Sequence, residues 1–347
     1  MREALTIREV AKIAGVSIAT VSRAVNESGP VSSETRAAIN RAIKQSGFRP
    51  NNIGRQLKTA RTETIGVLVP SLKNPIFADA VNGLEQAAGR QGYTVLLVAS
   101  GYRAEKELSA IETCLRSRVE GMVLTVADEN NSRALEVLNS AGIPYVLMFN
   151  PAKRRDVSSI SIDNRGAAYD LVSSLIELGH ERIAMIAGRR SESDRSAERQ
   201  AGYESALRDH GLSHAHATVV EVGFENPDLA SRIADLEQRP GAPTAYFCST
   251  DMLAMAVIRA LTTLGRRVPD DVSVVGFDGI AIGAYLAPSL CTVVQPAETM
   301  GLWAASHLLA RISNDEAITH QILPHRIRPG ESRGPAPRAS APGKDNG

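Results

Sequence analysis

Residues 6–58 read TIREVAKIAGVSIATVSRAVNESGPVSSETRAAINRAIKQSGFRPNNIGRQLK, and this stretch decides the fold of the amino-terminal region. Thr6, with Glu9 three residues later, spells a capping box, which predicts a helix that starts at about residue 7. Gly15 tolerates the left-handed conformation that ends many helices, and Ser17 predicts the cap of a second helix through residue 25. Two short helices around a glycine-containing turn predict a helix-turn-helix, whose second helix lies in the major groove of DNA.

The spacing alone is equally typical of an ordinary helical hairpin, because caps and glycine stops are common. The charge distribution favours DNA binding. Residues 1–61 contain eleven Lys or Arg and four acidic residues, a net charge of +7, whereas residues 62–347 contain 28 basic and 34 acidic residues, a net charge of −6. Each Lys or Arg that neutralises a DNA phosphate releases counterions, so a basic head on an acidic body fits a DNA-binding protein.

The rest of the head is predicted to close a three-helix core. Ser32 is expected to cap a third helix through about residue 46, with one apolar stripe and a stop at Gly47. Residues 51–58 are too few to form a stable isolated helix in water, because helices below about 12 residues are marginal.

From residue 64 onwards, short apolar segments alternate with amphipathic helical segments. This alternation predicts parallel βαβ units with helices on both faces of a sheet. The pattern begins a second time after residues 158–164 (SSISIDN), so two α/β halves in series are expected, with a cleft between them.

Several classes of protein are disfavoured by the sequence. No segment approaches the roughly 18 uninterrupted apolar residues of a membrane span, and the amino terminus lacks an apolar signal region, so a cytoplasmic protein without a membrane partner is expected. The motifs GxxxxGK[ST], HExxH and GxSxG are absent, which argues against an enzyme. Cys114, Cys248 and Cys291 lack metal-site spacing, and the pair His214 and His216 is more typical of a loop. We therefore predict no metal and no cofactor.

The runs TIREVAKIAGVSIATVSRAVN and VSSETRAAINRAIKQSGFRPN, followed by Gln56-Leu57, resemble the head and hinge of the lactose-repressor (LacI/GalR) family of bacterial transcription regulators. The resemblance covers almost the whole chain. It implies a small all-α helix-turn-helix head with a hinge helix, followed by a periplasmic-binding-protein-like core of two doubly wound parallel-sheet subdomains. The chain would cross between these subdomains near Ile162, Val293 and Leu323.

The expected boundaries follow from this resemblance. The head would span residues 1–49 and the hinge 50–61. Subdomain 1 would contain residues 62–161 and 293–321, and subdomain 2 residues 162–292 and 322–333. Residues 334–347 have little apolar content to bury and are expected to be disordered.

The resemblance also implies which residues contact DNA. In the hinge, Leu57 would be the apolar wedge that enters the minor groove and kinks it. The alternative is a plain linker leucine, which the match of the flanking residues disfavours. Arg23 is suited to bind guanine through two hydrogen bonds, and Ile18 and Ala19 to contact a thymine methyl group. The full set of expected contacts is Thr6, Ser17, Ile18, Ala19, Thr20, Ser22, Arg23, Asn26, Asn51, Leu57 and Lys58.

Candidate ligand-binding residues follow the core strands, because parallel sheets bind ligands at the carboxyl ends of their strands. Within this region, the resemblance to the family implies Asn74, Phe77, Arg199, Asp251 and Asp278. With the neighbouring candidates, the full set is Asn74, Phe77, Phe149, Ser193, Arg195, Arg199, Phe224, Asp251 and Asp278. An arginine donor fork and a carboxylate acceptor suit a polyhydroxylated ligand, and an aromatic ring stacks on a sugar or base. Structural alternatives stay open: Asp278 as the cap of the next helix, Arg199 as a solvated helix residue, and Asp251 as a structural cap or a residue that supports the ligand contacts from behind.

Two positions depart from the pattern of the family. Phe149 stands where many relatives carry a charged residue, so its role does not follow from the resemblance. The loop GRRSESDR adds Arg189, Arg190 and Arg195, whose charge is compatible with an anionic effector such as a sugar acid or phosphosugar. The expected effector is a sugar or sugar derivative, with the sugar acid, the phosphosugar and a nucleoside-like ligand as open alternatives.

The sequence therefore predicts a homodimeric transcription regulator, most simply a repressor, that binds a palindromic double-stranded DNA operator under the control of a small-molecule effector. No leucine heptads follow the core, so no tetramerisation tail is expected. A solute-binding protein of a transport system shares the core fold, but the basic head and the missing signal region argue against it.

Overall fold

The computed structural model describes residues 6–25, 29–48, 61–151, 153–212, 217–224, 229–314 and 317–337. The chain divides into two compact units, Met1–Thr62 and Glu63–Gly347, which are described separately below as the head and the core. Among the sequence predictions, those on Asn26, the hinge at residues 49–60 and the pair His214 and His216 lie outside the described residues.

The head contains three helices, α1 (Ile7–Ala14), α2 (Ile18–Val25) and α3 (Ser33–Ser46). The Glu9 carboxylate accepts the Thr6 backbone N–H at 2.6 Å, which is the returning half of the predicted capping box. Gly15 ends α1 with a φ of 67°, and the hydroxyl of Ser17 accepts the N–H of Thr20 at 3.1 Å at the start of α2. The predicted helix-turn-helix is thus present, with the expected residues at its ends.

A small apolar core holds the three helices together. The buried side chains are Val10 and Ala11 of α1, Val21 and Ala24 of α2, and Ile39 and Ala42 of α3. Partly buried residues surround this cluster, among them Phe48, which follows the αL residue Gly47 at the end of α3. Because α2 buries only two residues on its inner face, its other side chains remain available at the surface.

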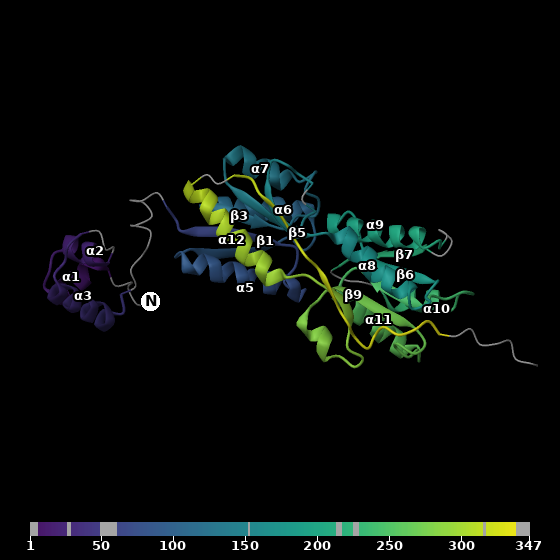
Figure 1. The fold of residues 1–347 in the computed structure, drawn as a ribbon. Coiled ribbons are helices and arrows are strands. Elements are labelled where there is room, and N and C mark those ends of the chain that lie inside the picture. The colour runs from purple at the N-terminus through teal and green to yellow at the C-terminus, as the bar shows by residue number, and fades with distance from the viewer. Residues whose placement is uncertain are drawn as a thin grey trace, which may run out of the picture. The chain divides into compact units, whose positions relative to one another are not determined.

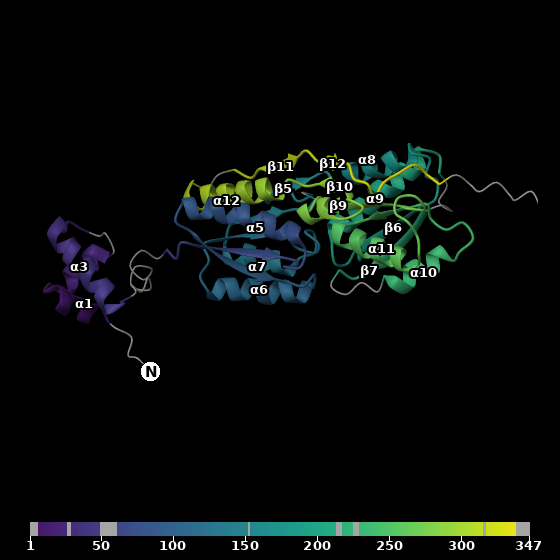
Figure 2. The ribbon, with the colours of Figure 1, turned by 90° about the horizontal axis from the view of Figure 1, so that it is seen from below.

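The core contains two six-stranded sheets with helices on both faces, which define two lobes (Figures 1 and 2). The first lobe consists of β1 (Thr64–Val69), α5 (Pro75–Arg90), β2 (Thr94–Ala99), α6 (Ala104–Arg116), β3 (Gly121–Leu124), α7 (Arg133–Ala141), β4 (Tyr145–Met148), β5 (Ser158–Ile162), α12 (Ala297–Asn314) and β11 (His320–Leu323). Its strand order is β11-β5-β4-β3-β1-β2, and all pairs are parallel.

The second lobe has the same design. It consists of α8 (Asn164–Ile176), β6 (Ile183–Gly188), α9 (Asp194–Asp209), β7 (Ala217–Val222), α10 (Ala230–Glu237), β8 (Ala245–Cys248), α11 (Asp251–Thr263), β9 (Ser273–Asp278), the 3-10 helix η2 (Ala281–Tyr285), β10 (Cys291–Val294) and β12 (Arg326–Arg328). The strand order is β12-β10-β9-β8-β6-β7, with β12 antiparallel to β10 and the other pairs parallel.

Three chain segments join the lobes, after β5, between β10 and α12, and between β11 and β12. The predicted crossings are therefore present, but two predicted boundaries are shifted by a few residues. Val293 pairs with β9 and belongs to the second lobe, and Ile322 and Leu323 pair with β5 and belong to the first. A strand continues until its ladder of backbone hydrogen bonds ends, a point that apolar patterning does not mark.

The late helix α12 packs on α5 in the first lobe, as expected, and the two helices lie side by side in Figures 1 and 2. Glycines make this close approach possible. A Cβ atom at Gly83 would lie 2.1 Å from the carbonyl oxygen of Glu298, and one at Gly301 would lie 1.8 Å from that of Ala80. Larger residues at either position would force the two helices apart.

The prediction of a disordered tail from residue 334 is wrong for its first residues. The Gly334 N–H donates to the Ser273 hydroxyl at 3.0 Å, and the Gly334 carbonyl lies 3.0 Å from Nε2 of His180. Further on, the Ala336 N–H donates to the Leu178 carbonyl at 2.9 Å. Backbone hydrogen bonds, which need no apolar side chains, hold this segment on the second lobe. Among the described residues, no helix is long and apolar enough to cross a membrane.

Candidate functional site

The outer face of α2 carries the side chains that the sequence assigned to DNA contacts. Ser17, Ile18, Ala19 and Arg23 are exposed, whereas Thr20 and Ser22 are partly buried. Ile18 leaves 45% of its surface exposed, so its side chain is available for an apolar contact with a base. Thr6, at the start of α1, is also exposed.

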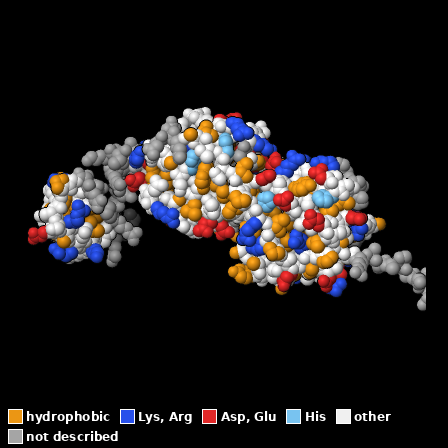
Figure 3. All heavy atoms as spheres, in the orientation of Figure 1, with side chains coloured by type: hydrophobic (Ala, Val, Ile, Leu, Met, Phe, Trp, Pro, Cys, Tyr) orange, Lys and Arg blue, Asp and Glu red, His pale blue; other side chains and the backbone are white. Residues whose placement is uncertain are grey.

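Figure 3 shows Lys and Arg side chains on the visible surface of the head. This surface charge agrees with the net charge of +7 in residues 1–61. An exposed helix with polar and apolar side chains on a basic domain can enter a major groove while neighbouring cations neutralise phosphates. The hinge residues Asn51, Leu57 and Lys58 lie outside the described part of the chain, so their role stays a prediction.

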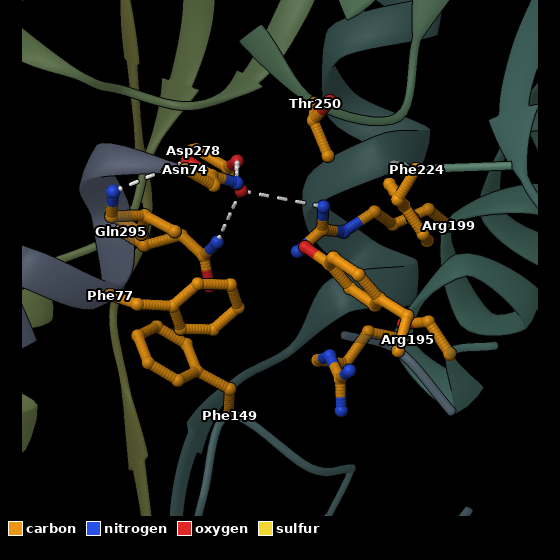
Figure 4. Close-up of a pocket in the computed structure, with 12 residues that line it drawn as sticks. Asn74, Phe77, Phe149, Arg195, Arg199, Phe224, Thr250, Asp278 and Gln295 are labelled. Carbon is orange, nitrogen blue, oxygen red and sulfur yellow. Dashed lines mark hydrogen bonds and ion pairs between the residues drawn. The ribbon is translucent and has the colours of Figure 1, made fainter. Parts of the chain in front are cut away.

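The second site is a cavity between the two lobes of the core, at the carboxyl ends of the parallel strands (Figure 4). It contains about 320 Å³ of unfilled space, including its opening to solvent. The first lobe contributes side chains from the start of α5 and the segments after β2 and β4, and the second lobe from α9, the start of α11, the end of β9 and the segment after β7. The lining residues are Asn74, Ile76, Phe77, Tyr102, Phe149, Ser193, Arg195, Arg199, Phe224, Thr250, Asp278 and Gln295.

The structure brings eight of the nine predicted ligand-binding residues to this cavity; the exception is Asp251. Four further lining residues did not emerge from the sequence: Ile76, Tyr102, Thr250 and Gln295. Three of these had a usable signal, because Ile76 lies within the segment NPIF, and Tyr102 and Thr250 follow apolar strand segments. Gln295 had none, since its position depends on where the chain crosses between the lobes.

Asp278 is the acceptor at the centre of the cavity (Figure 4). Its Oδ2 accepts a hydrogen bond from Nδ2 of Asn74 at 2.9 Å, and its Oδ1 accepts one from Nε2 of Gln295 at 2.9 Å. Nη1 of Arg199 lies 3.5 Å from the same Oδ1. Asp278 therefore connects the first lobe, the second lobe and the segment that joins them. Burial raises the pKa of Asp278, and the nearby Arg199 guanidinium opposes this change.

Arg199 is fixed in place by its own lobe. Its Nε donates to Oδ1 of Asn164 at 2.9 Å, its Nη1 donates to the carbonyl of Ser249, and its guanidinium carbon lies 3.7 Å from the centre of the Phe277 ring. Burial lowers the pKa of Arg199 to about 10, so the side chain remains a cation at neutral pH. The interpretation of Arg199 as a solvated surface residue is wrong, because only 5% of its surface is exposed.

Aromatic rings form two walls of the cavity. Tyr102 of the first lobe stacks on Phe224 of the second, with ring centres 4.4 Å apart and an interplanar angle of 19°. Phe77 and Phe149 meet edge to face at 5.5 Å. The Phe224 ring lies directly over Gly188, where a Cβ atom would come within 1.8 Å of the ring. Flat apolar faces with a carboxylate and a guanidinium between them are suited to a ring that carries hydroxyl groups.

Three lining residues other than glycine have a positive φ: 58° at Tyr102, 71° at Phe149 and 125° at Asp278. Such conformations are unfavourable for residues with a Cβ atom, and they cluster at functional sites of proteins. Phe149 directly follows β4, Asp278 ends β9, and Tyr102 lies in the turn after β2, three residues beyond its end. The chain turns at each of these residues, and their side chains line the cavity. This clustering is independent support for a functional cavity.

Asp251 is a correction to the sequence prediction, because its carboxylate points away from the cavity. Oδ2 accepts the backbone N–H groups of Gly279 and Ile280, each at 2.8 Å, and Oδ1 accepts the hydroxyl of Thr292. The residue is completely buried. Burial, with the negative charge of Asp278 nearby, raises the pKa of Asp251 to about 7. Asp251 thus binds the backbone N–H groups of Gly279 and Ile280, which agrees with its interpretation as a structural residue and not with a direct ligand contact.

The arginines of the loop after β6 are paired with acids. Arg189 Nη1 lies 3.1 Å from Glu192 and Arg190 Nε lies 2.9 Å from Glu221. Arg195, which lines the cavity, lies 3.0 Å from its neighbour Asp194 and donates to the carbonyl of Val126 at 2.8 Å. The positive charge that the sequence placed near the cavity is therefore compensated locally. Within the described residues, no group of three His, Cys, Asp or Glu side chains could hold a metal ion.

A helix-turn-helix head and a two-lobed α/β core with a cavity between its lobes define a ligand-controlled DNA-binding regulator. The chain belongs to the LacI family. Residues 6–51 match the model described as "Bacterial regulatory proteins, lacI family". Residues 62–328 match the model described as "Periplasmic binding proteins and sugar binding domain of LacI family". The two matches confirm the predicted family and fold class.

Individual relatives agree along almost the whole chain. Catabolite control protein A of Priestia megaterium is 33% identical over 325 residues, which cover 93% of this chain and 97% of the relative. The lac repressor dimer bound to operator and the anti-inducer ONPF superimposes with a TM-score of 0.83 at 26% identity, covering 95% of this chain and 99% of that chain. The transcriptional regulator CelR in complex with cellobiose superimposes with a TM-score of 0.69 at 30% identity, covering 94% of this chain and 99% of that chain. The chain is thus an effector-controlled DNA-binding regulator and not an enzyme.

Proposed function

We propose that the protein is a repressor that binds a two-fold symmetric operator as a homodimer in the cytoplasm, and that a sugar or sugar derivative in the interlobe cavity controls this binding. The observation that carries the proposal is the position of Asp278, whose carboxylate accepts hydrogen bonds from Asn74 of one lobe and from Gln295 at the crossing. A ligand that competes for this carboxylate alters a bond between the lobes.

The mechanism follows from linkage. A ligand shifts a conformational equilibrium only by its different affinities for the two states. The lobes contact each other directly through the stack of Tyr102 on Phe224 and the bond from Asn74 to Asp278. A ligand between these groups replaces the direct contacts with contacts of its own and changes how the lobes lie. In this proposal, the lobe movement reaches DNA through the hinge.

We propose a neutral polyhydroxylated effector in preference to an anionic one. Asp278 and Arg199 are present together, so the cavity offers both an acceptor and a donor for hydroxyl groups. Arg195 and Arg199 each lie beside a carboxylate, Asp194 and Asp278 respectively. A charged ligand would have to separate one of these pairs, which leaves a buried charge without its partner. The bound cellobiose of the similar regulator CelR supports a sugar.

Calorimetry decides between the charge classes. Matched probes are glucose, gluconate and glucose 6-phosphate, together with cellobiose, ribose and adenosine, each titrated into the full-length protein. Tighter binding of a neutral sugar than of its acid or phosphate supports the proposal. Tighter binding of gluconate or glucose 6-phosphate would establish the anionic class, and preference for adenosine would indicate a nucleoside-like effector.

The regulatory function is tested by selecting binding sites from random duplex DNA with the full-length protein, at fixed moderate salt, with and without a mixture of metabolites. A two-fold symmetric site recovered by the ligand-free protein supports a repressor released by an inducer. Recovery only in the presence of metabolites would indicate a corepressor. Recovery under neither condition would contradict specific DNA binding and favour the solute-binding alternative, which the relatives do not support.

A further inference from the structure

The turn after β9 adopts an unfavourable backbone conformation, and the aim of the Asp278 carboxylate depends on it. Asp278 has a φ of 125° and is followed by Gly279 with a φ of 80°. A residue with a Cβ atom rarely adopts such a φ, so surrounding groups must hold it there. A Cβ atom at Gly279 would lie 2.6 Å from Cα of Val294, which shows how closely the turn lies against β10.

Two buried or partly buried side chains hold this turn. Arg328 donates to the carbonyl groups of Gly279 at 3.3 Å and Ile280 at 3.1 Å, and Asp251 accepts the N–H groups of the same residues. Asp251 Oδ2 accepts both N–H groups that follow Asp278, those of Gly279 and Ile280, each at 2.8 Å. Its Oδ1 accepts the Thr292 hydroxyl from β10. Among the described residues, no cation forms an ion pair with Asp251. These hydrogen bonds therefore stabilise its buried carboxylate.

The β9 strand leaves room for this contact only because it carries a glycine. A Cβ atom at Gly276 would lie 2.3 Å from Oδ1 of Asp251. Asp251 is the first residue of α11, and its carboxylate therefore reaches across β9 to the turn. Three elements of the second lobe, α11, β10 and the turn after β9, meet at this one side chain.

We propose that Asp251 is a positioning residue for Asp278: it fixes the turn after β9 so that the Asp278 carboxylate faces Asn74 of the other lobe and the effector. The inference rests on the proposed function only in taking Asp278 as the acceptor for the effector. Asp251 itself does not line the cavity, and it acts on the cavity through the backbone of Gly279 and Ile280.

A positioning role differs from a merely structural role in one measurable way. A structural residue stabilises the second lobe, and its loss adds to the effect of any change in the first lobe. A positioning residue makes the effect of Asn74 depend on Asp251, because Asn74 bonds to Asp278 only when the turn aims that carboxylate correctly. Asn74 and Asp251 lie in different lobes and share no hydrogen bond with each other, so additive effects are otherwise expected.

The test is a double-variant cycle on the full-length, ligand-free protein. Spin labels at Ser140→Cys in the first lobe and Asp235→Cys in the second, both exposed positions, report the ratio of closed to open lobes as a distance distribution. The natural cysteines, Cys114, Cys248 and Cys291, are buried and should not react with the label. The cycle compares the parent, Asn74→Ala, Asp251→Ala and the double variant.

We expect Asn74→Ala to lower the closed-to-open ratio about tenfold in the parent, because it removes a hydrogen bond to a carboxylate. In the Asp251→Ala background, the same change should alter the ratio less than about twofold, because the carboxylate no longer faces Asn74. Asp251→Asn should restore the dependence on Asn74, since its amide oxygen accepts backbone N–H groups and its amide nitrogen donates to Thr292.

Glu237→Ala is the matched control, because Glu237 is another largely buried carboxylate of the second lobe. It accepts the Tyr246 hydroxyl at 2.7 Å and pairs with Arg266 at 2.8 Å, and it does not touch the turn. In this background, Asn74→Ala should keep its tenfold effect. If Asp251→Ala does not fold, Thr292→Val replaces it in the cycle, because it removes one anchor of the same carboxylate.

Equal effects of Asn74→Ala in the parent and in the Asp251→Ala or Thr292→Val background would overturn the proposal. So would a parent in which Asn74→Ala leaves the ratio unchanged, since the Asp278 bond would then not join the lobes. The measurement uses neither DNA nor effector, so its failure is distinct from a failure of the proposed repressor function.

Discussion

The Nδ2 of Asn74 donates to the Asp278 carboxylate at 2.9 Å, a bond between residues 204 positions apart in the chain and in different lobes of the core. The Oδ1 of the same Asn74 accepts the N–H of Ile76 at 3.2 Å and so caps α5. Asn74 is therefore fixed by its helix while its amide group reaches the other lobe. A ligand hydroxyl that donates to Asp278 must share or displace this bond, which couples ligand binding to lobe contact.

Asp278→Ala should abolish the response to the effector. It should also change the operator affinity of the ligand-free protein by at most about tenfold, because it removes the hydrogen bond from Asn74 that joins the lobes. The variant removes the acceptor at the centre of the cavity, and it lies in a unit separate from the head. Fluorescence anisotropy of labelled operator, titrated with the effector found by calorimetry, measures both quantities. Asp235→Ala, an exposed position of the same lobe, is the control. An unchanged effector midpoint would remove Asp278 from the binding site.

Arg23→Ala should weaken binding to the selected operator by roughly 1–3 kcal/mol and relax the preference at one base pair of each half-site. Arg23 is exposed near the end of α2, on the helix face opposite the buried Val21 and Ala24. Competition binding against operators with single base changes measures the relaxed preference. Lys12→Ala is the control, because Lys12 is an exposed residue of α1 and its loss also removes one positive charge from the head. An equal loss of affinity on every sequence would show that Arg23 contacts phosphate alone.

Leu57→Ala should weaken specific binding far more than non-specific binding. Leu57 lies outside the described residues, so this prediction rests on the sequence of the hinge and its resemblance to the family. An apolar wedge between base steps acts only where the protein bends its operator, at a cost of a few kcal/mol per unstacked step. Affinities for the operator and for scrambled DNA at one salt concentration give the comparison. Equal losses on both would show that Leu57 is a plain linker residue.

The sequence predicted those features that local chemistry determines. Thr6 and Glu9, Gly15 and Ser32 mark helix ends through contacts within a few residues, so their pattern was readable. The alternation of strands and helices likewise revealed two parallel α/β halves. Asp278 and Arg199, which the resemblance to the family implied, both line the cavity: Asp278 ends β9, and Arg199 lies within α9.

The features that the sequence did not predict depend on how distant segments meet. Tyr102 lines the cavity because the lobes bring it against Phe224, a contact that no local pattern indicates. Asp251 was placed in the ligand set because it follows a strand, but its carboxylate turns inward to the backbone after Asp278. Gly334 is held by hydrogen bonds to the second lobe, although its neighbours have the composition of a disordered tail. Backbone pairing and lobe contact leave little trace in composition.

Glu107 on α6 carries a buried carboxyl group, and its raised proton affinity predicts how the stability of the protein depends on pH. Only 2% of its surface is exposed, and its Oε1 accepts the Ala127 N–H at 2.7 Å. Burial raises the pKa of Glu107 to about 7; the Ala127 N–H and the Arg195 guanidinium oppose this rise, and the Asp194 carboxylate adds to it. The native state therefore binds a proton at pH values where the unfolded chain has already released it.

Glu107 should consequently lower the free energy of unfolding as the pH rises from about 5 to about 7.5, because in this range its carboxyl group is more protonated in the native state than in the unfolded state. Glu107 should contribute on the order of 2 kcal/mol to this loss. Glu107→Gln should flatten the profile, since the amide oxygen still accepts the Ala127 N–H but carries no proton to lose.

Urea unfolding of the full-length protein at several pH values measures the slope, and Glu136→Gln, at an exposed position of α7, is the control. Asp251, whose pKa is also raised to about 7, should keep part of the slope in the variant. An identical slope in Glu107→Gln and the parent would show that the Glu107 carboxyl is ionised in the native protein throughout this range.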